Sequence, residues 1–446
     1  MFSNASIVHH IRFRSARHLG FRPPAGARFA RSNARLMHQS SSDKPSSPKV
    51  EWDGEEEPLK DYAPDRNGYL PVALDDVLGN RYRIVRKLGW GTYSTVWIAQ
   101  DQSQSQADRP SYVALKVMSR VATEAQGRLQ ELELMRHIRD QSPQHPGHSH
   151  VVQLLDNFHQ DGPHGRHLCL VMEPLLQDLR SLSLRFKDRI FPSYFIRLLA
   201  RQAVLGLQYL HEECNIVHTD VKASNFMMVP PGDPKAFLAM TIPRLHPPET
   251  SLATGPDGNP IPRVRSRPVP YPLPDFYDMH ALDIWSGIRV KIGDVGVACF
   301  ADKIHDHFTE VIETPPLRAP EVAIGAGWGK PADVWSLGCT LYELYMGRTM
   351  FGKNVRDMEV PTMHTMMLGD YPPELIARGK ARSDYFNLDG SLQRPPERRT
   401  PFDKAVRERD TPDAPLFADF LRLTFALDPD KRATCRDLLR HPWLNP

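Results

Sequence analysis

The sequence predicts an α+β chain of two lobes, in which a small strand-rich lobe precedes a larger helix-rich lobe. Apolar and polar residues alternate in RYRIVRKLG, STVWIAQD and YVALKVM, between residues 81 and 118, with turn residues between these segments. Such alternation is the pattern of half-buried strands. Apolar residues at helical spacing dominate 192–211, 331–346 and 415–427 instead. The boundary therefore lies near Glu173–Leu175, which gives lobes of 81–173 and 174–446.

Bulk composition limits the classes of protein to which the chain can belong. Hydrophobic residues make up 41% of its 446 residues, which is enough for a large core. Without residues 1–42, the chain has 49 Lys and Arg and 53 Asp and Glu, and this slight acidic excess favours a basic partner over nucleic acid.

No apolar run approaches the ~18 residues of a membrane-spanning helix, so we expect a soluble protein without a membrane partner. We also expect a monomer. The five scattered cysteines form no C-x-x-C pair, which predicts neither a disulfide framework nor a zinc site.

Residues 1–42 contain seven arginines and many serines, but neither lysine nor acidic residues. This composition is typical of a mitochondrial transit peptide, and a disordered basic tail is the alternative interpretation. Residues 43–60, which include SSDKPSSPK and EWDGEEEPLK, have the composition of a polar linker. We therefore assign 43–80 to a linker and a lead-in, and 81–446 to the folded region.

A helix and two further strands complete the small lobe. AQGRLQELELMRHI, at 125–138, carries Leu129, Leu132, Met135 and Ile138 at helical spacing. VVQLLDNF and HLCLVMEPL, at 151–158 and 167–175, have the residue types and lengths of strands.

Residues 230–286 interrupt the helix-rich lobe with a segment rich in proline and glycine. A structureless loop of this length inside a compact domain indicates an insertion, which we expect to be largely disordered. A boundary between two independent domains is the alternative, but it would separate polar motifs that make sense only together. Within the segment, RVRSRP at 263–268 is expected to be solvated linker, and a phosphorylatable Arg-Ser element is the alternative.

LGWGTYSTV, at 88–96, is a glycine-containing turn between two predicted strands. Glycines allow the backbone to approach phosphate oxygens closely and to donate its N–H groups. A dinucleotide-binding turn would lead into a helix instead. The segment therefore predicts a loop that covers nucleotide phosphates, with Ser94 in place of the third glycine of that pattern.

Lys116 ends the next strand among apolar neighbours, so its ammonium group needs a partner. Glu131 lies fifteen residues further on in the predicted helix, and its position relative to the apolar stripe favours it over Glu133, the other candidate. A Lys–Glu pair of this kind would hold the amine against nucleotide phosphates. A solvated lysine on an exposed strand is the alternative.

HTDVKASN, at 218–225, follows the apolar segment FIRLLARQAVLGLQYL and places Asp220, Lys222 and Asn225 within six positions. Taken alone, such a segment fits a polar turn after a core helix. KIGDVGVA supplies Asp294 in an Asp-x-Gly turn, whose carboxylate can ligate Mg²⁺ at phosphate oxygens. The two segments predict catalysis only together with the motifs on either side of them.

The remaining motifs lie downstream. TPPLRAPEV contains Ala319-Pro320-Glu321, PADVWSLGCTLYEL predicts a buried helix with Asp333 near its start, and Arg432 is a candidate partner of Glu321. Six motifs thus follow in one order: G-x-G, V-A-L-K, D-x-K-x-x-N, D-x-G, A-P-E and a terminal arginine helix. This ordered set resembles that of eukaryotic protein kinases over residues 81–444. The resemblance implies the bilobal protein kinase fold, a protein substrate, and ATP and Mg²⁺ as cofactors.

Several segments resemble the SR-protein kinase (SRPK) family, the kinases of arginine–serine-rich splicing factors. KLGWGTYSTVW resembles its glycine loop, and HTDVK resembles its catalytic loop, with threonine in the usual arginine position. NGYLPVALDDVLGNRYRIV resembles the segment that leads into its first strand. The resemblance implies a divergent serine/threonine protein kinase of the cytoplasm or nucleus. Its expected substrates are Arg-Ser-rich splicing factors, through which it would regulate mRNA processing.

The resemblance also implies a role for each residue of the motifs. Asp220 would orient the substrate hydroxyl and accept its proton, and Lys222 would stabilise the γ-phosphate. Met172 would be the gatekeeper, with backbone groups of Glu173 and Leu175 offered to adenine. The full catalytic set is Asp220, Lys222, Lys116 and Glu131, and the Mg²⁺ ligands are Asn225 and Asp294. The expected ATP-binding residues are Leu88, Gly89, Trp90, Gly91, Thr92, Tyr93, Ser94, Val96, Ala114, Lys116, Met172, Glu173 and Leu175.

Two features depart from the usual pattern. Thr219 occupies the position of the arginine that usually pairs with a phosphorylated activation loop, so we predict activity without loop phosphorylation. The transit-like N-terminus predicts mitochondria, whereas the family resemblance predicts the cytoplasm or nucleus. The alternatives to an SRPK-like activity are a pseudokinase that serves as a scaffold and a mitochondrial kinase with unrelated substrates.

Overall fold

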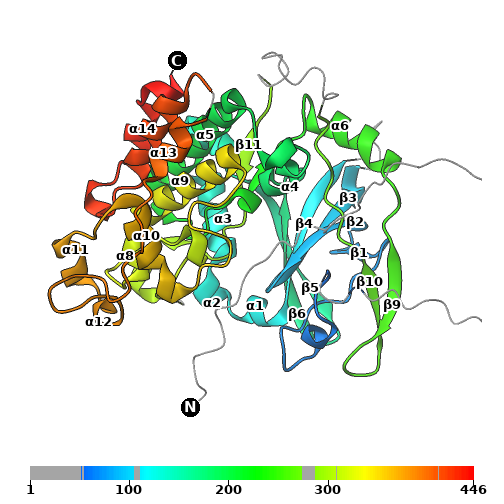
Figure 1. Ribbon diagram of the computed structural model, residues 1–446. Coiled ribbons are helices and arrows are strands. Elements are labelled where there is room, and N and C mark those ends of the chain that lie inside the picture. The colour runs from blue at the N-terminus through cyan, green and yellow to red at the C-terminus, as the bar shows by residue number, and fades with distance from the viewer. Residues whose placement is uncertain are drawn as a thin grey trace, which may run out of the picture.

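The structure is a computed structural model that describes Trp52 and residues 55–104, 111–273, 287–307, 309–409 and 411–445. Strands of the N-terminal lobe lie on one side of the molecule and helices of the C-terminal lobe on the other (Figure 1). The predicted α+β fold of a strand-rich lobe followed by a helix-rich lobe is thus confirmed. Residues 1–51, with the transit-like segment, lie outside the described residues. Within the described ranges, no helix combines the length and apolar character needed to cross a membrane.

Six strands of the described N-terminal lobe form one antiparallel sheet in the order β1-β2-β3-β4-β6-β5. They are β1 (Val77–Leu78), β2 (Tyr82–Gly91), β3 (Ser94–Asp101), β4 (Tyr112–Met118), β5 (Leu154–Gly162) and β6 (Gly165–Met172). Alternating residues of β2, β3 and β4 place one face of the sheet on a core that contains Ile84, Trp97 and Leu115. The strands predicted between residues 81 and 118 are therefore confirmed.

The helix predicted at 125–138 is divided in the structure. Its pieces are α2 (Gln126–Leu129) and α3 (Glu131–Asp140), and a further helix, α1 (Arg120–Glu124), precedes them. Gln130 adopts a left-handed conformation, with φ of 52°, and so separates α2 from α3. Met135 and Ile138 enter the core, whereas Leu129 and Leu132, expected on the same stripe, are only partly buried. A single continuous helix over this range is therefore wrong.

The C-terminal lobe is built around two helices that pack against each other, α5 and α9. Its helices are α4 (Leu179–Ser183), α5 (Ser193–Gln208), α8 (Pro320–Ala323), α9 (Lys330–Met346), α10 (Val360–Leu368), α11 (Pro373–Arg378), α12 (Arg382–Tyr385), α13 (Phe402–Arg407), α14 (Ala414–Thr424) and α15 (Cys435–Leu439). The helices predicted at 192–211, 331–346 and 415–427 correspond to α5, α9 and α14.

Two short antiparallel pairs beneath the sheet frame the polar motifs. They join β7 (Ile216–Val217) to β12 (Cys299–Phe300), and β8 (Phe226–Met228) to β11 (Val290–Ile292). The HTDVKASN segment connects β7 to β8, and the Asp-x-Gly turn connects β11 to β12. The two motifs are therefore held next to each other by the pairing of the strands that flank them.

The insertion is ordered over most of its length, so the expectation of a largely disordered segment is wrong for residues 230–273. It forms α6 (Pro234–Thr241) and an antiparallel hairpin of β9 (Thr250–Thr254) and β10 (Pro260–Val264). Val264 joins the core of the N-terminal lobe, and Ile261 packs against Tyr62 and Tyr69. Residues 274–286 lie outside the described residues.

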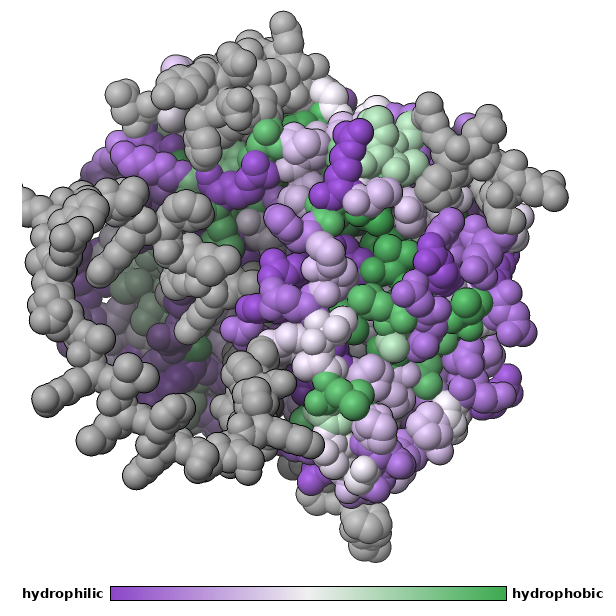
Figure 2. Space-filling view, turned by 90° about the vertical axis from the view of Figure 1, so that its right-hand side faces the viewer, coloured by the Kyte–Doolittle hydropathy of each residue, from purple (hydrophilic) through white to green (hydrophobic). Residues whose placement is uncertain are grey.

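The hairpin and the lead-in segment cover the outer side of the N-terminal lobe, at the right of Figure 1. Figure 2 shows this face, where hydrophobic residues gather in patches between hydrophilic ones. Glu56 and Glu57, predicted to lie in a polar linker, are 2% and 1% exposed. The linker interpretation of 43–60 is therefore wrong for this acidic part.

Candidate active site

A cleft of about 990 Å³, its open mouth included, lies between the two lobes. Its walls are mostly apolar, and polar side chains converge at one end, as in many nucleotide sites. The lining residues are Leu88, Gly91, Thr92, Tyr93, Ser94, Val96, Ala114, Lys116, Met118, Leu129, Glu131, Met135, Val152, Met172, Glu173, Leu175, Ser224, Asn225, Met227, Gly293, Asp294, Val295 and Gly296.

The glycine turn forms the tip of the β2–β3 hairpin and faces this cleft. The predicted ATP-binding residues on β4 and at the end of β6, including Ala114 and Met172, line it as well. Gly89 and Trp90 do not line the cleft. The indole Nε1 of Trp90 instead donates to the carbonyl of Glu55, at 3.1 Å.

Lys116 lies between two carboxylates at the polar end of the cleft. Its Nζ is 2.6 Å from Oε1 of Glu131 and 3.1 Å from Oδ1 of Asp294. Burial disfavours the ammonium group, but Asp294 and Glu131 outweigh this effect and raise the pKa of Lys116. Glu133, the other candidate partner, points to solvent on α3. The structure therefore brings together the Lys–Glu pair that the helical stripe favours.

The two carboxylates beside Lys116 differ in their electrostatics. Burial opposes ionisation of Asp294, but Lys116, with Lys222 nearby, outweighs it and lowers the pKa of that carboxyl. Burial raises the pKa of Glu131, and Lys116 only partly compensates. Asp294 is thus the more strongly anionic of the pair, which suits a ligand for a divalent cation.

Asp220, Lys222 and Asn225 form one hydrogen-bonded group on the β7–β8 loop. Lys222 Nζ is 2.5 Å from Oδ2 of Asp220, and Asn225 Nδ2 donates to the same oxygen at 3.1 Å. Asn225 also donates to the backbone carbonyl of Asp220 at 2.8 Å. Burial raises the pKa of Asp220, and Lys222 opposes the shift. The carboxylate is therefore held in one orientation and is a better proton acceptor than a solvated aspartate.

The side-chain oxygens of Asn225 and Asp294 are suitable ligands for a divalent metal ion. Oδ1 of Asn225 is buried and has no hydrogen-bond partner within the described ranges, although the amide nitrogen of the same side chain has two. A buried amide oxygen without a partner costs free energy that a cation can recover. Asn225 and Asp294 line the same cleft, and carboxylate and amide oxygens are the ligands that Mg²⁺ accepts.

Asp333, at the start of α9, fixes the catalytic loop by hydrogen bonds to its backbone. Its carboxylate accepts hydrogen bonds from the backbone N–H groups of His218 and Thr219, at 2.7 and 2.8 Å, and contacts Nε2 of His211 at 2.8 Å. His218 in turn contacts the carbonyl of Gly293 at 3.0 Å. The sequence places Asp333 near a helix start, but no local signal indicates this contact across 115 residues.

Two residues of the site have strained backbone conformations. Thr219 and Asp294 adopt left-handed conformations, with φ of 67° and 57°. Non-glycine residues in this region are uncommon and cluster at functional sites. The hydrogen bonds of Thr219 to Asp333 and Val297, at 2.8 and 2.7 Å, help to maintain the loop in this shape.

Apolar lining residues are the part of the cleft that sequence reasoning misses. Met227 on β8, Val152 before β5 and Met135 on α3 all face it. An apolar residue on a strand or helix has the same local pattern whether it faces the core or a ligand, so these positions carry no distinguishing signal. Gly293 and Gly296, which flank Asp294 and Val295, complete this wall.

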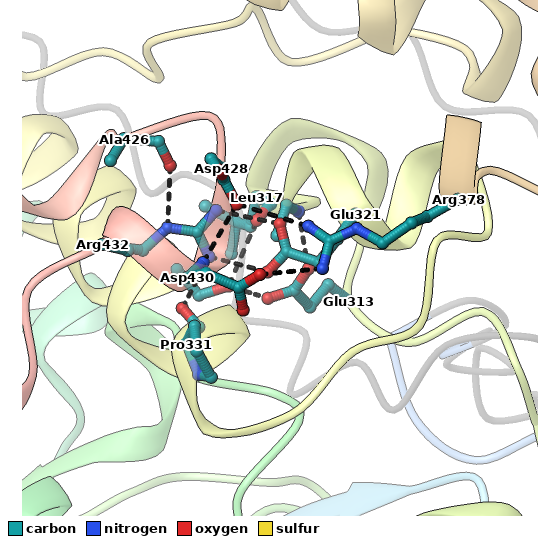
Figure 3. Close-up of polar contacts among 11 residues, drawn as sticks. Glu313, Leu317, Glu321, Pro331, Arg378, Ala426, Asp428, Asp430 and Arg432 are labelled. Atoms are coloured by element: carbon teal, nitrogen blue, oxygen red, sulfur yellow. Dashed lines mark hydrogen bonds and ion pairs between the residues drawn. The ribbon is translucent and has the colours of Figure 1, made fainter. Parts of the chain in front are cut away.

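A buried ion pair stabilises the platform that follows the activation segment. Arg432 forms two hydrogen bonds to Glu321, at 2.7 and 2.8 Å, and both side chains are at most 1% exposed. Figure 3 shows Arg432 also reaching the carbonyls of Pro331 and Ala426. The structure therefore pairs Arg432 with Glu321 as the motif order suggests.

Comparisons with known proteins agree with this geometry. The model of the protein kinase domain family matches residues 82–237 and 281–444, so the unmatched residues 238–280 fall within the insertion. Serine/threonine-protein kinase SRPK of Physarum polycephalum is 32% identical, over 88% of this chain and 92% of the relative. SRSF protein kinase 3 of Mus musculus is 28% identical, over 88% and 91%. Protein kinase dsk1 of Schizosaccharomyces pombe is 28% identical, over 87% and 85%.

A solved structure supports the fold alone. The crystal structure of a kinase domain with 24% identity superimposes with a TM-score of 0.61 and covers 84% of this chain and 98% of its own. Together with the family match and the relatives, it confirms the bilobal kinase fold predicted from the order of six motifs. The chain belongs to the protein kinase family, as a divergent member of its SRPK branch, and is a serine/threonine protein kinase.

Proposed function

We propose that this kinase transfers the γ-phosphate of ATP to serines of Arg-Ser-rich proteins, such as splicing factors, and thereby regulates mRNA processing. The observation that carries the proposal is the similarity to Physarum polycephalum SRPK over 88% of this chain. The name of the Mus musculus relative, SRSF protein kinase 3, describes a kinase of such proteins. The excess of acidic over basic residues outside 1–42 supports a basic substrate.

The residues of the cleft suit an in-line phosphoryl transfer. Lys116, fixed by Glu131, would hold the phosphates of ATP, and the glycine loop would cover them with backbone N–H groups. Asn225 and Asp294 would hold Mg²⁺, which when bound supplies charge neutralisation at the phosphate oxygens. These residues position the reactants and stabilise the charge that develops during the reaction. The two effects make up the largest part of catalysis in phosphoryl transfer.

Asp220 and Lys222 would act on the acceptor side. The Asp220 carboxylate, oriented by Asn225 and Lys222, would accept a hydrogen bond from the substrate serine and take its proton. Lys222 would balance the negative charge that develops on the transferred phosphoryl group. Each residue that the chemistry requires is therefore present on an element that faces the cleft or its mouth.

The test compares two peptides with the purified full chain and Mg-ATP. One peptide is an Arg-Ser repeat and the other has lysine in place of every arginine, so that charge is equal and only the guanidinium differs. We expect kcat/KM to be higher for the Arg-Ser peptide by about tenfold or more, and transfer to be lost in Asp294→Ala. Equal rates for the two peptides would overturn the proposed specificity. Transfer to neither, with ATP still bound, would favour a scaffold or unrelated substrates.

A further inference from the structure

Ser266 belongs to an Arg-Ser-Arg sequence of the insertion that is docked on the N-terminal lobe. The expectation that RVRSRP is a solvated linker is wrong, because Ser266 makes two hydrogen bonds to one buried carboxylate. Its backbone N–H donates to Oε1 of Glu56 at 2.6 Å, and its Oγ donates to Oε2 at 2.7 Å. The two residues lie 210 positions apart, so this contact joins the insertion to the lead-in segment.

Glu56 also binds the ammonium group of Lys87, which lies on β2. Oε2 of Glu56 is 2.8 Å from Nζ of Lys87, and Glu57 binds the same ammonium group. All three side chains are at most 2% exposed. Charges this deeply buried must be paired, and removing one partner leaves the others uncompensated. The two glutamates therefore determine where the lead-in segment lies relative to β2.

The lead-in segment in turn contacts the glycine loop directly. The hydroxyl of Tyr69 lies 2.7 Å from the carbonyls of both Gly91 and Thr92. Trp90 Nε1 donates to the carbonyl of Glu55, the residue before Glu56. Because Gly91 and Thr92 line the nucleotide cleft, the position of the lead-in segment affects the loop that would cover ATP. Ser266 is thus connected to the nucleotide site through Glu56.

We propose that Ser266 is a phosphorylation site, that a second copy of this kinase modifies it, and that its phosphorylation separates Glu56 from Lys87 and loosens the glycine loop. The proposal rests on the proposed Arg-Ser specificity, since Arg265 and Arg267 flank the serine. Residues 265–273 form neither helix nor strand, so another active site can accept them as an extended segment after they detach. Ser266 does not line the cleft of its own chain, which makes the reaction intermolecular.

The reaction is the ordinary transfer from ATP. A bond forms between Oγ of Ser266 and the γ-phosphorus, and the bond from that phosphorus to the β–γ bridging oxygen breaks. ADP leaves, and the hydroxyl proton passes to Asp220 of the second copy and then to solvent. The product carries a phosphoserine with a charge of about −1.5 to −2 at pH 7.

Electrostatics determines what the phosphoserine does. The new phosphate would lie against the carboxylate of Glu56, and two anions at hydrogen-bond distance repel each other strongly when buried. The phosphate is also the better partner for Lys87, because it has more charge and more acceptor oxygens. Arg263 on β10 adds a nearby cation, since its Nε and Nη2 are buried without a hydrogen-bond partner in the described part of the chain. Glu56 is therefore displaced, and the lead-in segment keeps only Glu57 as its buried attachment to Lys87.

The first experiment locates the phosphate. Affinity-tagged full-length Asp294→Ala chain serves as the acceptor, untagged native chain as the enzyme and an Arg-Ser peptide as a substrate in the same tube with Mg-ATP. The tagged acceptor is then separated from the enzyme for peptide mapping by mass spectrometry. We expect phosphate at Ser266 of the acceptor, and none there when the acceptor also carries Ser266→Ala. Ser103→Ala is the matched control, because Ser103 is exposed on the same lobe but lies between glutamines. Phosphorylation of the peptide without Ser266 would overturn this proposal alone, whereas failure of both substrates would overturn the proposed function as well.

The second experiment measures the effect on the nucleotide site. KM for ATP is compared between chain phosphorylated at Ser266 and native chain, with the Arg-Ser peptide as phosphate acceptor. Loss of a charge-assisted buried contact should raise KM for ATP about fivefold or more while kcat changes less. Glu56→Gln should raise it in the same direction without any phosphate, and Ser266→Ala should leave it near the native value. An unchanged KM for ATP after complete phosphorylation, or in Glu56→Gln, would overturn the coupling.

Discussion

The guanidinium of Arg432 binds both carboxylate oxygens of Glu321, and neither side chain is accessible to water. The pair connects α8, at the end of the activation segment, to the C-terminal helices (Figure 3). Arg432 has further hydrogen bonds to the carbonyls of Ala426 and Pro331, and lies over the ring of Trp335 at 5.1 Å. Nearly all of the five N–H donors of the Arg432 guanidinium therefore have a hydrogen-bond acceptor. A buried ion pair can be stable only when its remaining donors and acceptors are paired in this way.

Glu321→Gln should destabilise the protein by about 3–5 kcal/mol, because it leaves the buried guanidinium without its counter-charge. Asp430→Asn is the matched control, since Asp430 pairs with Arg378 close by but both side chains are exposed. The control should cost less than ~1 kcal/mol. Urea unfolding of the three proteins measures both effects, and equal losses in the two variants would contradict a special role of burial.

Glu131→Gln should lower kcat/KM by about a hundredfold, because Lys116 then loses the anion that positions its ammonium group in the cleft. Glu133→Gln provides a control on the same helix, since Glu133 is exposed and should change activity by less than about twofold. Steady-state kinetics with varied ATP separates the effect on binding from the effect on transfer. Similar losses in both variants would show that α3 as a whole, rather than the Lys116 contact, determines activity.

Thr219 occupies the position of an arginine that usually pairs with a phosphorylated activation loop. In this structure the threonine contacts the backbone of the activation segment instead. Its hydroxyl donates to the carbonyl of Val297 at 2.7 Å, which attaches the catalytic loop to the start of the activation segment without a phosphate. We therefore expect phosphatase-treated enzyme, with its phosphate content checked by mass spectrometry, to retain its kcat. Thr219→Val should lower the free energy of unfolding by about 1–2 kcal/mol. Complete loss of activity after phosphatase treatment would refute this prediction.

The half-buried Glu313 places its carboxyl group between the activation segment and α9. The N–H of Ala319 donates to its Oε2 at 2.7 Å, and Ser336 contacts its Oε1. The same serine hydroxyl reaches the carbonyl of Leu317 at 3.1 Å, although it has only one proton to donate. A protonated Glu313 that donates to the serine oxygen satisfies every group. Burial raises the pKa of Glu313 well above its ordinary value, which favours this neutral form.

Glu313→Gln preserves a neutral side chain and should therefore alter the pH dependence of stability rather than the fold. Because the folded pKa of Glu313 is raised above the unfolded one, its contribution is complete below the unfolded pKa and is lost as the pH rises through the folded pKa. Glutamine has no such loss, so the variant should gain stability relative to the native protein as the pH increases. Urea unfolding at several pH values measures this difference, with the exposed Glu310→Gln as control. A difference that does not vary with pH would mean that Glu313 is ionised.

Residue types and local spacing are enough to predict most of the fold and the polar half of the site. Strand alternation has a period of two residues and helical patterning a period of 3.6, so both can be recognised within one segment. Lys116, Asp220 and Asp294 can be named because the order of their motifs resembles that of protein kinases, in which the matching residues act as a cation, a base and a metal ligand. The break at Gln130 and the apolar lining of the cleft cannot be predicted in this way, since neither changes the local pattern.

Contacts between distant segments depend on packing in three dimensions. Glu56 and Ser266 each lie in a segment whose composition alone indicates a solvated linker, yet they form a hydrogen bond with each other, and Glu56 pairs with the buried Lys87. The acidic lead-in pairs with the Arg-Ser-Arg segment that follows β10, because the free energy of a charge pair depends on distance and burial and not on separation along the chain. The order of residues thus specifies the kinase fold and its chemistry. Tertiary packing determines which of the many charged groups form ion pairs with each other.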